Sequence, residues 1–223
     1  MNICFDLDGP IIDVSDRYYR AYLESLKGYD ISSEHILSKE DFWKFKQNRV
    51  TDIEIGILTG LTFKEAKKSA DLRRKITFLS EFLPLDKLYG DVIETFNFLN
   101  SKGIPFFMAT LRRDSQMQYA VKQFKLDKYF NSNFLFALEE EQKVEGDIQE
   151  KYTLFFSAIN KLHLNPQETW IIGDSDTDIH AARLAKIKTI VGITRGIRSK
   201  EQLEILAPDY IVSNLREFVS LIK

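Results

Sequence analysis

Two aspartates near the start of the chain have the spacing of a catalytic or metal-binding pair. Residues 3–5 form a short apolar run, typical of a strand buried on both faces, and Asp6 and Asp8 follow it before Gly9 and Pro10 break the strand. Two carboxylates at the end of a buried strand are costly unless a cation or hydrogen-bond donors compensate their charge. The pattern therefore predicts a functional acidic site or, as the simpler alternative, a polar strand end followed by a turn.

Further candidates for the same site lie far downstream. Residues 169–172 predict a second buried strand, which leads into an acidic segment with Asp174 and Asp178. Between the two acidic segments, a buried strand ends at Thr110, and Lys151 stands at the head of an amphipathic helix. These residues in this order resemble the haloacid dehalogenase superfamily of aspartate-nucleophile phosphohydrolases, and the resemblance extends over essentially the whole chain.

The resemblance implies roles for the first acidic segment. Asp6 would be the nucleophile, whose carboxylate attacks phosphorus and forms an aspartyl-phosphate. Asp8 would be the general acid that protonates the departing alcohol and then the general base that activates water. Gly9 permits the turn and lets backbone N–H groups approach the phosphate.

The cofactor that the resemblance implies is Mg²⁺, a hard cation that prefers oxygen ligands. Its implied ligands are Asp6, the backbone carbonyl of Asp8, and Asp174. Asp178 lies one helical turn after Asp174 and, together with Ser175, would hold neighbouring groups in place or bind the ion through water. Asp176 has a simpler explanation as an acidic residue in the first turn of a helix, where the helix dipole stabilises it.

Phosphoryl transfer also needs donors and positive charge around the phosphoryl group. Thr110 offers a hydroxyl and a backbone N–H at a strand end, although a threonine that simply closes the strand is the alternative. The family usually has asparagine or serine next, whereas this chain has Leu111, which leaves only the backbone N–H as a donor. Arg112 or Arg113 could bind a substrate anion; a solvated or helix-capping pair is the other interpretation.

Lys151 is the candidate for the lysine that balances the charge of the nucleophile and the phosphate in this superfamily. Its helix and its distance before Asp174 fit that role, although Tyr152 stands where the family often has proline. Lys143 is the alternative lysine.

The elements that position these residues fall into two predicted domains. Residues 14–83 contain no convincing buried strand, and their apolar residues recur at helical spacing. We therefore expect an all-helical cap domain there, inserted into a core domain of residues 1–13 and 84–223. Thr62 followed by Glu65 is a capping-box pattern that opens one of the cap helices.

One cap segment is a candidate for substrate contact. Residues 46–49 resemble the segment that lies over the active site in phosphoglycolate phosphatases and β-phosphoglucomutases. Arg49 could therefore meet a substrate carboxylate or phosphate when the cap closes, and a solvated helix end is the alternative.

The core has the pattern of an α/β fold. From Pro84 onward, predicted strands alternate with predicted helices, which indicates parallel pairing with right-handed crossovers in a Rossmann-like sheet. Ligands of such sheets bind outside the carboxyl ends of the strands. The candidate residues lie at those ends or in the loops just beyond them.

The composition excludes several classes of protein. The chain has 223 residues, of which 44% are hydrophobic, and its net charge is -2 with no sustained basic run, so we expect no nucleic-acid partner. Cys4 is the single cysteine and cannot form an internal disulfide. No leader and no apolar run approaching the roughly 20 residues of a membrane span is evident, so we expect a soluble cytoplasmic protein, monomeric or homodimeric.

The expected function is a Mg²⁺-dependent phosphatase acting on a small phosphorylated metabolite, because a cap over the site favours small substrates over phosphoproteins. Residues 191–196 and 207–210 look most like phosphoglycolate phosphatase, but the cap sets substrate choice, so this similarity does not name the substrate. Two alternatives remain open: a phosphomutase of the β-phosphoglucomutase type and a catalytically silent binding protein on the same scaffold. A dehalogenase is less favoured because its chemistry does not need the Asp8 acid or Mg²⁺.

Overall fold

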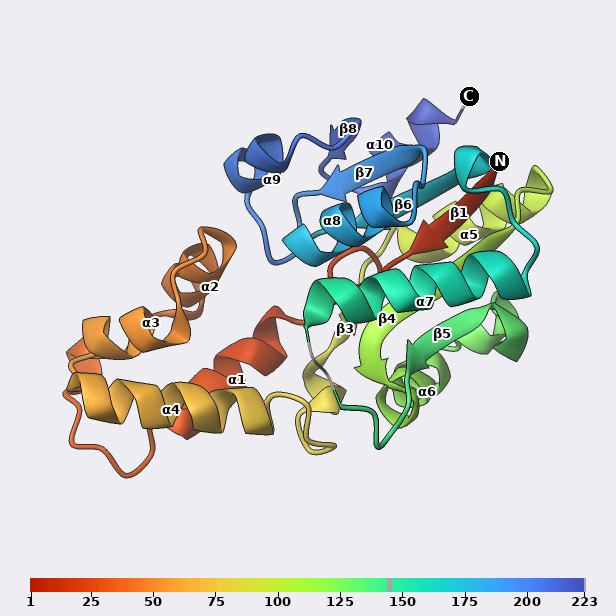
Figure 1. Cartoon of the computed structure of the whole chain (residues 1–223). Helices are drawn as coiled ribbons and strands as arrows, with labels where there is room; N and C mark the ends of the chain where they lie inside the picture. Colours follow the sequence, from red (N-terminus) through yellow and green to blue (C-terminus); the bar gives the residue numbers. More distant parts are fainter. Residues whose placement is uncertain (144–145, 223) are drawn as a thin grey trace.

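The core of the molecule is a parallel sheet with the first strand at its centre (Figure 1). The computed structural model describes residues 1–143 and 146–222; Val144, Glu145 and Lys223, which the expected core domain includes, lie outside the described residues. In this part of the chain six strands pair in parallel in the order β5-β4-β1-β6-β7-β8. Their bounds are β1 Asn2–Phe5, β4 Phe106–Arg113, β5 Leu135–Leu138, β6 Thr169–Gly173, β7 Thr189–Ile193 and β8 Tyr210–Val212. The topology confirms the expected α/β class.

The sheet is buried on both faces because alternate residues of its strands meet helices on opposite sides. Ile3 and Phe5 belong to one apolar cluster with Phe96 of α5 and Phe218 of α10, whereas Cys4 belongs to a second cluster with residues of α7, α8 and α9. Figure 1 shows α7 and α8 in front of the sheet and α5 and α10 behind it. The core helices are α5 Val92–Ser101, α6 Asp114–Gln123, α7 Asp147–Lys161, α8 Asp176–Leu184, α9 Lys200–Leu206 and α10 Leu215–Leu221.

A helical cap lies beside the sheet, on the side toward which the strands point (Figure 1). Its helices are α1 Ser15–Ser25, α2 Lys39–Gln47, α3 Asp52–Leu58 and α4 Phe63–Ile76. The capping box predicted at Thr62 and Glu65 is present and opens α4. A separate apolar cluster holds the cap together, and Tyr22 and Phe42 stack in it with ring centroids 4.8 Å apart. No helix among the residues described is both long and apolar enough to cross a bilayer.

The structure differs from the sequence-based expectation at three places near the site. A two-residue antiparallel pair, β2 Ile12–Asp13 with β3 Lys87–Leu88, joins the segments where the chain leaves and re-enters the core. Strand β4 continues past Thr110 to Arg113, with an irregular register between Ala109 and Arg113. Helix α7 begins at Asp147, so Lys151 lies in its second turn and not at its head. The residues of the site are thus held by longer elements than the pattern indicated.

Candidate active site

A pocket of about 290 Å³ opens at the carboxyl ends of the central strands. The residues that line it come from the segment after β1, the cap, the ends of β4 and β5, helix α7, the segment from the end of β6 into α8, and the loop after β7. Those that the sequence analysis proposed are Asp6, Asp8, Thr110, Leu111, Arg112, Lys151, Asp174, Ser175 and Asp178. The fold therefore brings most of the proposed site residues, scattered over the chain, into one concavity. Gly9 and Arg49 do not line it.

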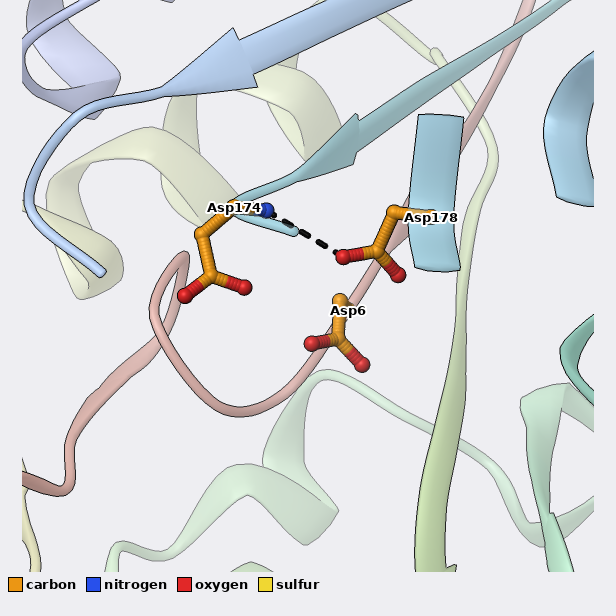
Figure 2. Close-up of side chains that lie close together, drawn as sticks. All are labelled: Asp6, Asp174 and Asp178. Carbon is orange, nitrogen blue, oxygen red and sulfur yellow. Dashed lines mark hydrogen bonds between the residues drawn. The ribbon is translucent and has the colours of Figure 1, made fainter. Parts of the chain in front are cut away.

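Three buried carboxylates converge in this pocket. One oxygen each of Asp6, Asp174 and Asp178 lies within 4.8 Å of the others (Figure 2). Burial raises the pKa of Asp6 to about 7, with Lys151 opposing this shift and Asp178 adding to it. Burial, Asp178 and Asp6 together raise the pKa of Asp174 well above its usual value. Such a cluster is unfavourable without a compensating cation, and its oxygen donors and spacing fit a hard divalent ion such as Mg²⁺.

Lys151 supplies a positive charge directly against this cluster. Its Nζ lies 2.6 Å from Asp6 Oδ1 and 2.9 Å from Asp178 Oδ1, and the residue is 1% exposed. Burial by itself would lower the pKa of Lys151, but Asp178 and Asp6 outweigh it and raise the pKa above the usual value. The lysine is therefore held fully charged beside the proposed nucleophile. Lys143, the alternative, is exposed.

Asp178 holds the loop after β6 in place. Its Oδ2 accepts bonds from the backbone N–H groups of Asp174 and Ser175, both at 3.2 Å, and from Ser175 Oγ at 2.7 Å. Figure 2 shows the first of these bonds. Ser175 is the N-cap residue of α8, and its Oγ accepts a bond from the backbone N–H of Asp178. A Cβ at Gly173 would lie 2.3 Å from Asp178 Cβ, so only glycine leaves room for this carboxylate.

Two glycines close around Asp174. A Cβ at Gly9 would lie 2.3 Å from Asp174 Cγ, and one at Gly196 would lie 1.8 Å from Asp174 Oδ2. The backbone N–H of Ile197 donates to the same Oδ2 at 2.5 Å. Gly9 also has φ +91°, which suits glycine, but its own N–H donates to Ile12 O at 2.9 Å and is engaged in the turn. Gly9 therefore leaves room for Asp174 by its lack of a side chain, while its own N–H is engaged in the turn.

Asp8 is bound by two arginines. Arg112 Nε donates to Asp8 Oδ1 at 2.8 Å, and Arg17 Nη2 donates to Asp8 Oδ2 at 2.9 Å. Burial alone would raise the pKa of Asp8, but Arg112 and Arg17 outweigh it and lower the pKa. Both arginines also contact Asp86. Sequence analysis missed Arg17 and Asp86, which are 69 positions apart, and no local pattern pairs residues at that separation.

The end of β4 contributes a hydroxyl to the pocket. Thr110 is buried, and its Oγ1 accepts a bond from the Arg112 backbone N–H at 3.2 Å, which does not use the hydroxyl hydrogen. Leu111 lines the pocket and packs against the second apolar cluster. Arg113 is the N-cap residue of α6 and donates to Glu139 O at 2.5 Å. Of the two arginines, Arg113 thus follows the capping interpretation, while Arg112 lies at the site.

Arg49 contacts the core outside this pocket. It forms an ion pair with Asp176, whose other oxygen accepts a bond from Arg198 Nε at 2.6 Å. The cap residues that do line the pocket are Val14, Tyr18 and Phe78, which sequence analysis did not select. Asp176 is therefore a cap–core contact as well as an acidic residue in the first turn of α8.

Comparison with known proteins agrees with this geometry. A family model described as haloacid dehalogenase-like hydrolase matches residues 3–192, so the chain belongs to that family. The pyrophosphatase PpaX of Anoxybacillus flavithermus is 26% identical over 229 residues, which cover 99% of this chain and 95% of the relative.

Solved structures share the fold over the whole chain. A haloacid dehalogenase-like family hydrolase from Streptococcus pneumoniae superposes with a TM-score of 0.73 at 22% identity, covering 100% of this chain and 98% of the other. A predicted phosphoglycolate phosphatase from Haemophilus somnus gives 0.69 at 20% identity, with coverage of 100% and 97%. The family model and the curated relative support a phosphatase-type hydrolase, and the structural neighbours share its fold, which confirms the resemblance found in the sequence.

Proposed function

We propose that the protein is a Mg²⁺-dependent phosphatase of small phosphorylated compounds that works through an aspartyl-phosphate on Asp6. The observation that carries the proposal is the placement of Lys151 Nζ 2.6 Å from Asp6, inside a group of three buried carboxylates. A nucleophile that must approach an anionic phosphoryl group needs such positive charge around it. The pocket of about 290 Å³ suits a small substrate.

Asp6, Asp174 and the backbone carbonyl of Asp8 would hold the ion. When bound, Mg²⁺ supplies positive charge that offsets the buried carboxylates and polarises the phosphoryl oxygens. Asp178 would support the site indirectly, because its carboxylate is engaged with Lys151 and with the loop after β6.

The residues of the chain would then act in two displacements. In the first, an Asp6 carboxylate oxygen bonds to phosphorus while the bond to the leaving oxygen breaks. The protonated form of Asp8, a minor form because Arg112 and Arg17 lower its pKa, gives its proton to that oxygen. In the second, Asp8 takes a proton from water, whose oxygen attacks phosphorus and releases phosphate and the Asp6 carboxylate. Lys151 and the Thr110 hydroxyl stabilise the charge on the phosphoryl oxygens in both steps.

The substrate proposal combines two supports. The relative at 26% identity is named a pyrophosphatase, and a structural neighbour is described as a predicted phosphoglycolate phosphatase. The corresponding substrates, pyrophosphate and phosphoglycolate, are small and carry a second anionic group next to the phosphoryl group that is transferred. We therefore propose pyrophosphate as the first substrate to test and phosphoglycolate as the second.

We also propose that residues 14–83 act as the cap domain over a core of residues 1–13 and 84–223. Tyr18 and Phe78 line the pocket from the cap and support a role in excluding bulk water during the reaction.

The test is phosphate release from pyrophosphate, phosphoglycolate and p-nitrophenyl phosphate, each with Mg²⁺ and with EDTA. We expect release with Mg²⁺ only, and its loss in Asp6→Asn. Asp16→Asn is the matched control, because Asp16 lies on cap helix α1 and pairs with Lys39 and Lys87. Unchanged turnover in Asp6→Asn would reject the nucleophile. A sugar phosphate is added as a fourth substrate, because its conversion into an isomer without phosphate release would indicate a phosphomutase instead.

A further inference from the structure

A closed ring of ion pairs surrounds Asp8 at one side of the pocket. The ring consists of Asp8, Arg17, Asp86 and Arg112 and is called the Asp8 ring below. Arg17 Nη2 and Arg112 Nε meet the two oxygens of Asp8 at 2.9 and 2.8 Å. Arg17 Nε and Arg112 Nη2 meet the two oxygens of Asp86 at 2.8 and 2.6 Å. Every carboxylate oxygen of the ring therefore accepts a charged hydrogen bond, which fixes the rotation of both carboxylates.

The ring is balanced in charge and almost entirely buried. Arg17, Arg112 and Asp86 are 0%, 2% and 3% exposed, whereas the Asp8 side chain retains 22% exposure. Asp8 lines the pocket and would act on the substrate. Asp86 does not line the pocket and contacts both arginines. Removing one partner would leave an uncompensated buried charge, so each member of the ring depends on the other three.

The ring also joins the cap to the core. Asp8 follows β1 and Arg112 belongs to β4, both in the core, whereas Arg17 belongs to α1, the first helix of the cap. The Arg17 guanidinium lies 4.6 Å from the centre of the Phe78 ring, which lines the pocket beside it. A movement of α1 relative to the sheet would therefore act on Asp8 through Arg17.

We propose that Arg17, Arg112 and Asp86 are positioning residues for Asp8, and that Arg17 couples the orientation of Asp8 to the position of the cap. The inference rests on the proposed function, in which Asp8 transfers protons. A carboxylate that gives and then takes a proton at two different oxygen atoms must be held at a defined angle, and small displacements of such a group cost about 100-fold in rate.

The principal variant is the charge-balanced pair Arg17→Met with Asp86→Asn, which keeps the Asp8–Arg112 contact. We expect kcat for p-nitrophenyl phosphate to fall at least about 10-fold, while KM and inhibition by inorganic phosphate change less than about twofold. The matched control is Arg20→Met with Asp16→Asn, also on α1, whose partners are Glu24, Lys39 and Lys87 at the surface. This control should retain the parent kcat.

A double-mutant cycle separates positioning from general support of the fold. If the ring acts through Asp8, the Arg17→Met/Asp86→Asn pair causes no further loss of single-turnover rate in an Asp8→Asn background. An equal loss in both backgrounds would overturn the proposal. If the paired variant does not fold, Arg112→Lys provides the same test, because a lysine keeps the charge but cannot bridge Asp8 and Asp86 in a fork.

The two proposals fail in different ways. Parent-like kcat in the ring variants, together with an inactive Asp6→Asn, would reject the positioning role and leave the phosphatase proposal standing. An active Asp6→Asn would reject the phosphatase mechanism itself, whatever the ring variants do.

Discussion

At the scale of single residues, most charges of the site are tolerated because they have a partner of opposite sign, whereas the Asp174 carboxylate accepts a bond only from the Ile197 N–H within the described part of the chain. Lys151 faces Asp6 and Asp178, and Asp8 faces Arg17 and Arg112. A buried charge that loses its partner is strongly destabilising. Substitutions here should therefore change stability and activity together, and controls must separate the two effects.

Lys151→Met should abolish activity and lower the free energy of unfolding by about 3 kcal/mol, because it leaves Asp6 and Asp178 buried without their cation. Urea unfolding in EDTA measures the stability, and phosphate release with Mg²⁺ measures the activity. Lys143→Met removes an exposed lysine and should change neither. The reverse result would assign the charge-balancing role to Lys143.

Gly196→Ala tests the space around Asp174. An added Cβ would lie 1.8 Å from Asp174 Oδ2, so the carboxylate must move, at a cost of about 1–3 kcal/mol in stability. If Asp174 is a metal ligand, the Mg²⁺ concentration for half-maximal activity should rise at least about 10-fold. Gly90→Ala is the control, since a Cβ there meets nothing within 4 Å. An unchanged Mg²⁺ requirement would argue against Asp174 as a ligand.

At the scale of elements, the end of α2 is attached to the loop between β7 and α9. Gln47 Nε2 donates to Gly196 O at 3.0 Å, and the Ser199 N–H donates to Gln47 O at 3.2 Å. Arg49 adds its ion pair with Asp176. The cap segment 46–49 thus contacts the same loop that holds Asp174 through Ile197. We therefore expect segment 46–49 to affect catalysis through its contact with this loop.

Arg49→Ala should therefore change KM only slightly and should cause no further change in an Asp176→Ala background, although Asp176→Ala also removes the contact with Arg198. The Arg49 side chain is 41% exposed, so the ion pair is worth only about 0–1 kcal/mol and each single change should alter KM by less than about fivefold. Steady-state kinetics of both single variants and the double variant measure the coupling. Additive effects, with a large rise in KM for Arg49→Ala alone, would instead place Arg49 on the substrate.

At the scale of the whole molecule, the buried acids connect stability to pH and to Mg²⁺. The pKa of Asp6 is about 7 in the fold against 3.8 as its ordinary value, so the folded protein binds the extra proton between these values. The stability that comes from protonated Asp6 is fully present below about pH 4 and is lost as the pH rises through about 7. A carboxylate that is costly to ionise in the fold becomes favourable once a cation is bound.

In EDTA, the melting temperature should therefore fall between pH 5 and pH 8, with a loss of stability on the order of 3 kcal/mol from Asp6 over this range. Saturating Mg²⁺ should reduce this fall, and Asp6→Asn should remove the part that Asp6 contributes, while Asp174, whose pKa is also raised, keeps its own part. Thermal melts followed by circular dichroism provide the measurement. A stability that rises with pH in EDTA, as for a carboxylate with a lowered pKa, would contradict the assignment.

The sequence by itself determined the sheet core and the acidic centre. Strands such as residues 3–5 and 169–172 carry apolar side chains on both faces, and parallel strands place their carboxyl ends at one edge of the sheet. Asp6 and Asp174 were therefore expected at the same edge, and the family resemblance placed them in one site. The capping box at Thr62 is equally local, because its partner lies only three residues away.

Only the tertiary structure decided which charges pair across the cap and the core. Arg17 and Asp86 are 69 positions apart, and Arg49 and Asp176 are 127 apart. Arginines and aspartates are common on surfaces, and a periodic pattern reports which face of an element is buried but not which distant side chain it meets. The partners of Asp8 and the contact of Arg49 follow from how the cap packs on the sheet, which no local pattern encodes.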